Sequence, residues 1–435
     1  VLVFSYMGHT TQEITIENQT TLDVVMKETS FALEQVVVVG YGQQKKVNLT
    51  GAVSAVQVDE KMAGRSIANT STALQGLVPG LTVTQSSGMA GNNSAEILIR
   101  GLGTINNASP LIVVDDMPDV DINRLNMDDI ESISVLKDAT ASSVYGSRGA
   151  NGVVLIKTKS GKSGKTQITF SGSYGWEKPI RSYSFLSDYA QALEVHRTAQ
   201  AASNIAETAQ QYQKGTVDQW LAMGMVDSRK YPNTDWWDLI MRTGSMQNYN
   251  VSASGGNEAS NFYASIGYLK QEGLQINNDY DRYNVRFNYD YKLFKNLTTG
   301  FRVDGNWSNF TYALTNGFTG GSGGNMDIQN AIAGITPYDP LLDAYGSVMA
   351  IGEDPTAFNP LEYFNNHLKY KDEQQLNGSF YLDWEPIKGL NARIDYSLRY
   401  YNSFEKQADN PNQAYNFQTG TYNKWYVNES AGISN

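Results

Sequence analysis

Two stretches of this chain alternate strictly between apolar and polar residues, and they limit the folds that it can adopt. One runs from Tyr283 to Leu293 and the other from Leu390 to Tyr400. A period of two places all the apolar side chains on one face of a β-strand. Less regular alternating runs occupy residues 168–176, 262–269, 297–307 and 376–384. The pattern predicts a large antiparallel sheet with one apolar and one polar face.

The connections between these strands alternate between short and long. Tight turns are expected at Asn257–Ser260, Phe294–Asn296 and Pro386–Gly389. The stretches from about 177 to 246 and from 310 to 373 are long. Bacterial outer-membrane barrels have short periplasmic turns and long extracellular loops. A transmembrane antiparallel β-barrel is therefore the predicted fold, with its first strand leading outward.

The expected number of strands is too small for a complete barrel of this kind. We count seven strands before residue 405, or eight if Thr421–Val427 forms one. Single-chain bacterial barrels have even strand numbers, and eight strands enclose only a narrow lumen. No signal peptide precedes Val1, and the first residues already form part of a predicted strand. We therefore expect an incomplete barrel in a chain that is truncated at both ends.

Composition excludes several other classes of protein. A formal net charge of −11 argues against a nucleic-acid partner, because phosphate binding needs clustered basic residues. No apolar run is long enough for a transmembrane helix. The chain has no Cys, and its three histidines are too far apart in sequence to form a metal-ligand pair. No arrangement of residues predicts a catalytic site, so we expect a protein that is not an enzyme and has no cofactor or metal.

Residues from Thr50 to Lys159 mix helix and strand signals and predict an α+β domain. Short helices are expected at Ser71–Leu77 and Ala139–Tyr145. Buried strands are expected at Ile97–Ile99, Leu111–Val114 and Gly152–Ile156. The length of about 110 residues is normal for a compact domain.

Four consecutive valines, Val36–Val39, precede this domain and are followed by Gly40, Tyr41 and Gly42. A short β-branched run of this kind can be a buried strand. It can also add itself to the edge of another protein's sheet through main-chain hydrogen bonds. The pattern alone leaves both readings open.

The run from Leu136 to Ile156, LKDATASSVYGSRGANGVVLI, resembles the motif that closes the plug of SusC/RagA-like TonB-dependent outer-membrane transporters. Ile99–Gly101 and Pro110–Asp115 are similar to two further plug motifs of that family. Asp116 departs from the glycine that the family commonly has there. The resemblance implies that these signature residues are structural: Asp138, Tyr145, Gly146, Arg148, Gly149, Asn151 and Gly152.

The resemblance also implies a division of the chain. Residues 1–32 would be the end of a carboxypeptidase-regulatory-like β-sandwich, and residues 33–46 a TonB-box segment and linker. Residues 47–162 would be the plug, and residues 163–435 the first seven or eight barrel strands with long extracellular loops. Family members have about 22 strands around a plugged lumen. The TonB-binding residues would be Val36, Val37, Val38, Val39, Gly40 and Tyr41.

The function implied is TonB-dependent import of glycan oligosaccharides or peptides across the outer membrane of a Gram-negative, Bacteroidetes-like bacterium. The partners implied are outer-membrane lipid, a SusD-like lipoprotein acting as a lid, and TonB with its inner-membrane proton-motive complex. Two alternatives remain: a siderophore- or cobalamin-type TonB-dependent importer without a lid, and a soluble β-rich carbohydrate-binding protein.

Three further motifs have weaker functional readings. Lys159–Thr166 resembles a phosphate-binding loop but lacks its first glycine and leads into a strand, so a polar linker is expected. The carboxylates at 115, 116, 119 and 121 lack the ligand order of a calcium loop and are expected to be solvated. Trp236 and Trp237 would suit the face of a sugar ring, or would pack within the first long loop.

Overall fold

The structure is a computed structural model, and most of its described residues lie in four ranges. These are 68–180, 189–226, 233–313 and 367–409, with short gaps at 86, 105–106, 139–141 and 211–213. The remaining described residues are 2–4, 12–14, 24, 36–39, 42–45, 53–58, 350–351, 364–365, 412–416 and 421–425.

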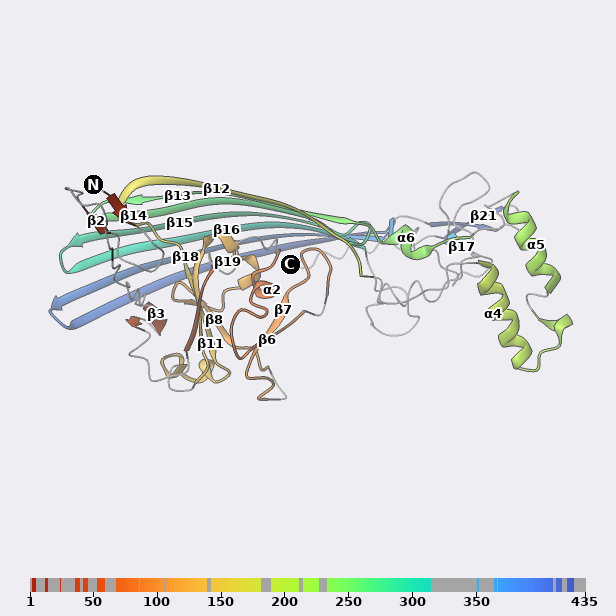
Figure 1. The fold of residues 1–435 in the computed structure, drawn as a ribbon, viewed down its shortest axis with the longest axis horizontal. Coiled ribbons are helices and arrows are strands. Elements are labelled where there is room, and N and C mark those ends of the chain that lie inside the picture. Colours follow the sequence, from red (N-terminus) through yellow and green to blue (C-terminus); the bar gives the residue numbers. More distant parts are fainter. Residues whose placement is uncertain are drawn as a thin grey trace.

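A curved sheet of seven antiparallel strands runs along the long axis of the molecule (Figure 1). Each strand pairs with the next one along the chain within this sheet. Its strands are β12 (Gly164–Glu177), β13 (Gly244–Gly256), β14 (Ser260–Glu272), β15 (Asp279–Phe294), β16 (Leu297–Ala313), β18 (His367–Ile387) and β19 (Leu390–Asp409). This order confirms the predicted seven-stranded antiparallel wall.

The two ends of this wall differ. The three predicted tight turns connect β13 to β14, β15 to β16 and β18 to β19, and all lie at one end, here called the short-turn end. Helices α4 (Tyr189–Ala202), α5 (Lys214–Gly224) and α6 (Trp236–Ile240) lie toward the opposite, long-loop end (Figure 1). None of the helices in the described ranges has the length and apolarity needed to cross a membrane.

The predicted eighth strand forms but does not extend the wall. Residues Thr421–Trp425 are strand β21, which pairs with β20 (Asn412–Asn416). Together with β17 (Ala350–Ile351) they make a separate three-stranded sheet. The count of eight wall strands is therefore wrong for the described residues, because an alternating pattern predicts a strand but not its partner.

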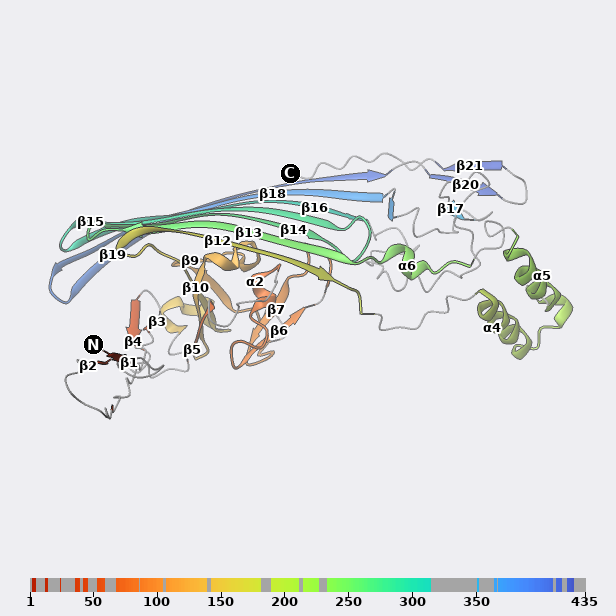
Figure 2. The ribbon, with the colours of Figure 1, turned by 45° about the horizontal axis from the view of Figure 1, so that its top comes forward.

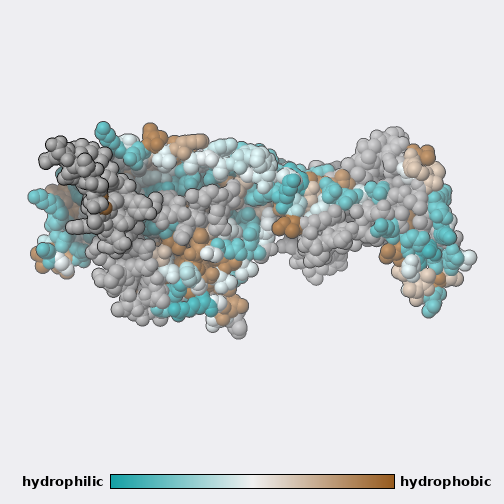
Figure 3. Space-filling model, viewed as in Figure 1, coloured by the Kyte–Doolittle hydropathy of each residue, from teal (hydrophilic) through white to brown (hydrophobic). Residues whose placement is uncertain are grey.

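The burial pattern of the wall is the reverse of that of a sheet in a soluble protein. Its apolar face is exposed, and hydrophobic residues are visible along β12 at the upper edge of Figure 3. Exposed apolar side chains include Ile168, Phe170, Trp176, Ile266, Val285, Trp307, Leu376 and Ile394. Its polar face is buried, with Asn250, Asn284, Asn288, Asn306, Gln375 and Asn377 all less than 9% exposed. Apolar residues outward and polar residues inward are the arrangement of a transmembrane barrel wall.

The plug lies against the buried polar face (Figure 2). Its main sheet has the order β5-β10-β11-β8-β9, and β6 and β7 form a separate hairpin. The strands are β5 (Val53–Gln57), β6 (Leu81–Gln85), β7 (Ala95–Ile99), β8 (Leu111–Val114), β9 (Met117–Pro118), β10 (Ile130–Leu136) and β11 (Val153–Thr158). A single-turn helix α2 (Thr70–Ala73) and two short 3-10 turns, η2 (Ile122–Arg124) and η3 (Met127–Asp129), complete the part that faces the wall.

The plug has its own hydrophobic core. Ile130, Ile133 and Val135 of β10 pack with Val154 and Ile156 of β11, and each of these side chains is at most 2% exposed. The three predicted buried strands are confirmed as β7, β8 and β11. The helix expected over 71–77 is shorter, since only α2 is helical, and residues 139–141 of the other expected helix lie outside the described ranges.

Two small hairpins precede the plug and lie toward the short-turn end (Figure 2). Strand β1 (Leu2–Phe4) pairs with β2 (Gln12–Ile14), and β3 (Val36–Val39) pairs with β4 (Gly42–Lys45). The other residues of the predicted β-sandwich remnant, except residue 24, lie outside the described ranges.

Candidate functional site between the plug and the wall

A polar seam joins the plug to the wall. The carboxyl group of Asp129 in η3 accepts a hydrogen bond from the Tyr263 hydroxyl of β14 at 2.8 Å. Nearby, the Asn126 amide donates to the Asn250 side chain of β13 at 3.1 Å. Ser171 of β12 donates to Asp128 at 2.8 Å. Side chains of the wall's polar face therefore hold the plug by hydrogen bonds rather than by apolar packing.

Arg286 of β15 is the most deeply buried cation of this seam, with a side chain only 3% exposed. Its guanidinium lies 2.9 Å from Asp304 of β16, 3.3 Å from Asp115 of the plug and 3.8 Å from Asp129 of the plug. Three carboxylates thus share one guanidinium. Burial raises the pKa of Asp129 above its ordinary value despite this neighbour. The cluster ties two plug segments to two wall strands.

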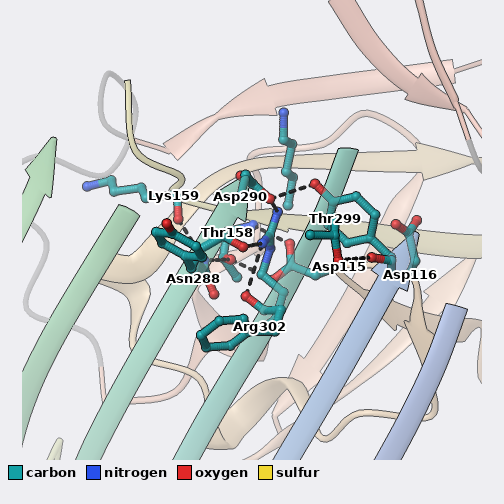
Figure 4. Close-up of polar contacts among 12 residues, drawn as sticks. Asp115, Asp116, Thr158, Lys159, Asn288, Asp290, Thr299 and Arg302 are labelled. Carbon is teal, nitrogen blue, oxygen red and sulfur yellow. Dashed lines mark hydrogen bonds and ion pairs between the residues drawn. The ribbon is translucent and has the colours of Figure 1, made fainter. Parts of the chain in front are cut away.

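Thr158, the last residue of β11, extends the Arg286 cluster (Figure 4). Its backbone N–H and its hydroxyl both donate to Asp115, at 2.9 and 2.5 Å. Asn288 of β15 donates to the Thr158 hydroxyl and to the Lys159 carbonyl, at 2.9 and 2.8 Å. These bonds fix the end of β11 where the chain leaves the plug for the wall. Residues 159–163 connect β11 to β12, whereas Gly164, Lys165 and Thr166 of the predicted linker already belong to β12.

A second ion pair has the opposite polarity, with the cation on the plug. Arg124 of η2 lies 2.9 Å from Glu373 of β18, whose side chain is 4% exposed. The Arg124 carbonyl accepts hydrogen bonds from Asn284 at 2.8 Å and from Asn306 at 3.1 Å. The guanidinium also lies over the Tyr401 ring, 5.0 Å from its centroid. Four wall strands therefore converge on one plug residue.

The acidic turn of the plug is solvated only in part: Asp119 and Asp121 are exposed, as the sequence predicted, whereas Asp115 and Asp116 pair with the wall. Asp116 pairs with Arg393 of β19 at 2.7 Å, in addition to the pairing of Asp115 with Arg286. Burial raises the pKa of Asp116. Asp119 pairs with an arginine of the plug, and Asp121 accepts from a backbone N–H at the start of η2. In the described part of the chain, no three His, Asp or Glu side chains gather as a metal site would need.

Three cavities lie between the plug and the wall. One of about 240 Å³ is at the long-loop end and borders Tyr280, Phe310 and Tyr312. A small one of about 20 Å³ borders Arg286. The largest of the three, of about 570 Å³, is at the short-turn end. It borders Arg302, Asp115 and Asp116 (Figure 4), and polar side chains of β11, β18 and β19.

The glycines of the plug signature are needed by its backbone. Gly146 has φ 58° and ψ −142°, a conformation that is essentially limited to glycine. Gly152 has φ 88°, and a Cβ atom there would lie 2.6 Å from the Ile99 Cδ1 atom. A Cβ atom at Gly149 would lie 2.8 Å from the Ser142 carbonyl oxygen. Larger residues would therefore displace neighbouring plug segments.

The other signature residues connect parts of the plug to one another. Tyr145 packs beside the apolar cluster that includes Leu136 and Val153. The polar members make the following contacts: Asp138 with Arg100 at 2.6 Å, Arg148 with Asp119, and Asn151 with the Asn107 carbonyl at 2.9 Å. None of these contacts reaches the wall.

None of the seam contacts given above involves the two predicted binding segments. Val36–Val39 form a strand, as predicted, and its outer edge has no strand partner among the described residues. Gly40 and Tyr41 lie outside the described ranges. The Trp237 side chain is 6% exposed in the long-loop region, which agrees with the packing alternative, and the Trp236 side chain is not described.

The sequence did not identify the residues of the seam. Arg286 and Asn288 were visible only as polar members of an alternating strand, and Glu373 belonged to a long predicted loop. The one available signal was the charged and amide-rich polar face of the run from Tyr283 to Leu293, which an apolar core could not accept.

Comparison with known proteins agrees with this architecture. Residues 45–153 match the family model described as TonB-dependent Receptor Plug Domain. The chain is 34% identical to TonB-dependent receptor P26 of Formosa agariphila, over 95% of this chain and 40% of that protein. It is 30% identical to TonB-dependent receptor SusC of Bacteroides thetaiotaomicron, over 82% of this chain and 32% of that protein.

The fold also matches the RagAB peptide importer in its open-open state. The TM-score is 0.70 at 28% identity, and the match covers 86% of this chain and 43% of that chain. The chain belongs to the SusC/RagA-like family of TonB-dependent receptors. This SusC/RagA-like chain spans less than half the length of each of these relatives. Its seven-stranded sheet is part of an outer-membrane barrel wall, and its α+β domain is the plug.

Proposed function

We propose that the chain is the plug-bearing part of a TonB-dependent importer of glycan oligosaccharides or peptides. The observation that carries this proposal is the seam, in which a plug with its own core is held to the wall by ion pairs and hydrogen bonds. Such contacts can be exchanged for contacts with water, so a plug held this way can be displaced without exposing an apolar interface.

The orientation follows from the two ends of the wall. Short turns are periplasmic and long loops extracellular in barrels of this kind. The short-turn end, toward which β3 lies, would then face the periplasm, where TonB would reach it (Figure 2). The 240 Å³ cavity at the long-loop end would face the outside, where ligand arrives.

TonB would add a strand to the outer edge of β3. The test is binding of a purified periplasmic TonB domain to the full-length protein in detergent. Val38→Pro removes a backbone N–H donor, so TonB binding should be lost if that N–H points to the edge that pairs with TonB. The N–H groups of neighbouring strand residues point to opposite edges, so Val37→Pro tests the other case. Val38→Thr keeps the N–H and the β-branch and should bind like the wild type. Binding that survives both proline variants would contradict strand addition.

A surface lipoprotein of the SusD type would cover the long-loop end, as the family resemblance implies. Purification of the full-length protein from outer membranes should yield this lipoprotein in a fixed ratio. A preparation that transports ligand without any such partner would instead favour the siderophore- or cobalamin-type importer.

A further inference from the structure

The three cavities form one row along the inner face of β15, β16 and β18. On β16, Ser308 borders the cavity at the long-loop end and Asp304 borders the small cavity. Arg302, farther along the same strand, borders both the small cavity and the cavity at the short-turn end. On β18, the corresponding residues are Glu373, Asn377 and Tyr381. Because inward-facing residues recur every second position, the row follows the strands from one end of the wall to the other.

One plug element divides this row. The small cavity shares Asp115, Arg302 and Ser379 with the cavity at the short-turn end, so these two adjoin. It shares no lining residue with the cavity at the long-loop end. Between them lies η2, with Arg124 on one side and Leu125 on the other.

One buried polar atom without a partner belongs to a residue of this row. Arg124 borders the cavity at the long-loop end, and its Nη1 atom is buried without a hydrogen-bond partner. Arg282 donates from Nη1 to the Asn123 carbonyl of η2 at 2.6 Å. Because a buried donor without a partner is costly, the cavity at the long-loop end favours a ligand with hydrogen-bond acceptors.

Helix α2 is hydrogen-bonded to η2 and to the residue that follows it. The Thr70 hydroxyl donates to the Leu125 carbonyl at 3.1 Å, and the Ser71 backbone N–H donates to the Asn123 side chain at 3.2 Å. Thr70 and Ser71 are at most 1% exposed. Along the chain, α2 follows β5, an edge strand of the plug sheet, and both lie between β3 and η2. A pull applied at β3 therefore reaches β5 and α2 before it reaches η2.

We propose that ligand crosses the plug along the wall of β15, β16 and β18, and that η2 is the gate. Withdrawal of α2 breaks its two hydrogen bonds to the η2 segment. Residues of η2 then move away from the wall, and the three cavities become one passage. The lining of charged and amide side chains fits an extended polar oligomer and disfavours an apolar ligand. This inference rests on the proposed function, since it needs a pull at β3.

Single cysteines can test the passage, because these 435 residues contain no Cys. Ser379→Cys places a thiol on the short-turn side of η2, and Ser308→Cys places one on the long-loop side. Ser254→Cys on the inner face of β13 is the control on a wall strand away from the row. The probe is a membrane-impermeant maleimide added outside cells that express the full-length protein. Ser379→Cys, which lies beyond η2 for a reagent that enters from the long-loop end, should be labelled when the cells are energised and should lose labelling with an uncoupler. Ser308→Cys and Ser254→Cys should show no such dependence.

Energy-dependent labelling at Ser254→Cys but not at Ser379→Cys would overturn the passage. Absence of TonB binding and of energy-dependent uptake would instead refute the proposed function, so the two failures can be told apart. A second pair of variants tests the gate. Thr70→Val should raise labelling of Ser379→Cys in unenergised cells roughly fivefold, the factor that one lost hydrogen bond allows. Thr72→Val removes a hydroxyl bonded only within α2 and should not.

Discussion

Replacing Arg286 by methionine should loosen the plug more than any other single change in the wall. Methionine keeps much of the side-chain volume but leaves Asp115, Asp129 and Asp304 without their shared cation. Removing one partner of a buried ion pair costs about 3–5 kcal/mol. The variant could instead relieve the repulsion by protonating one carboxylate. At pH 7 this costs about three pKa units, or roughly 4 kcal/mol, so the loss of docking free energy per carboxylate has a similar upper bound.

Hydrogen exchange of the β8 and β11 amides in the full-length protein would measure this change. A loss of about 4 kcal/mol corresponds to roughly a thousandfold faster exchange, if opening of the plug limits exchange. The matched control is Arg302→Met, because Arg302 pairs with Asp290 within the wall at 2.7 Å. Adding Asp304→Asn to Arg286→Met should recover part of the loss. The reasoning is refuted if Arg286→Met accelerates exchange less than tenfold, or no more than Arg302→Met does.

Three further changes should have distinct effects. Glu373→Gln removes the charge that faces Arg124 and should increase leakage into cells of an antibiotic too large for porins; unchanged sensitivity would count against this pair as a seal. Gly152→Ala should destabilise the plug by roughly 1–3 kcal/mol in thermal unfolding, whereas Gly103→Ala, with open space around it, should not. Burial raises the pKa of Asp116 above 3.8, so its contribution to plug docking should weaken as pH rises through that pKa. Asp116→Asn should remove this part of the pH dependence of amide exchange, and an unchanged profile would contradict it.

The wall could be predicted in detail because its signal is local. The alternation from Tyr283 to Leu293 specifies a strand and its two faces, and the tight turns specify antiparallel neighbours. The same rule failed at Thr421–Trp425, where a real strand pairs outside the wall. In the plug, β5, β6 and β10 were not predicted, since such short strands show no clear alternation of apolar and polar residues.

The seam could not be predicted because its contacts are distant in sequence. Arg286 and Asp115 are 171 positions apart, and Asn306 and Arg124 are 182 apart. A single sequence shows that a polar face exists but not what it faces. The plug signature, by contrast, was recognisable because it is one continuous motif. Its glycines at 146 and 152 have positive φ, and at 149 a Cβ atom would meet the backbone.

The central claim is active import driven through β3, and uptake from a defined mixture tests it most directly. Cells expressing the full-length protein would receive a mixed library of glycan oligosaccharides and peptides, and mass spectrometry would follow depletion of each class from the medium. We predict that one class is depleted by wild-type cells with an intact proton-motive force, and not by cells whose protein carries the proline variant, Val37→Pro or Val38→Pro, that loses TonB binding. Equal depletion with and without the proton-motive force, or by the wild type and that variant, would contradict the account.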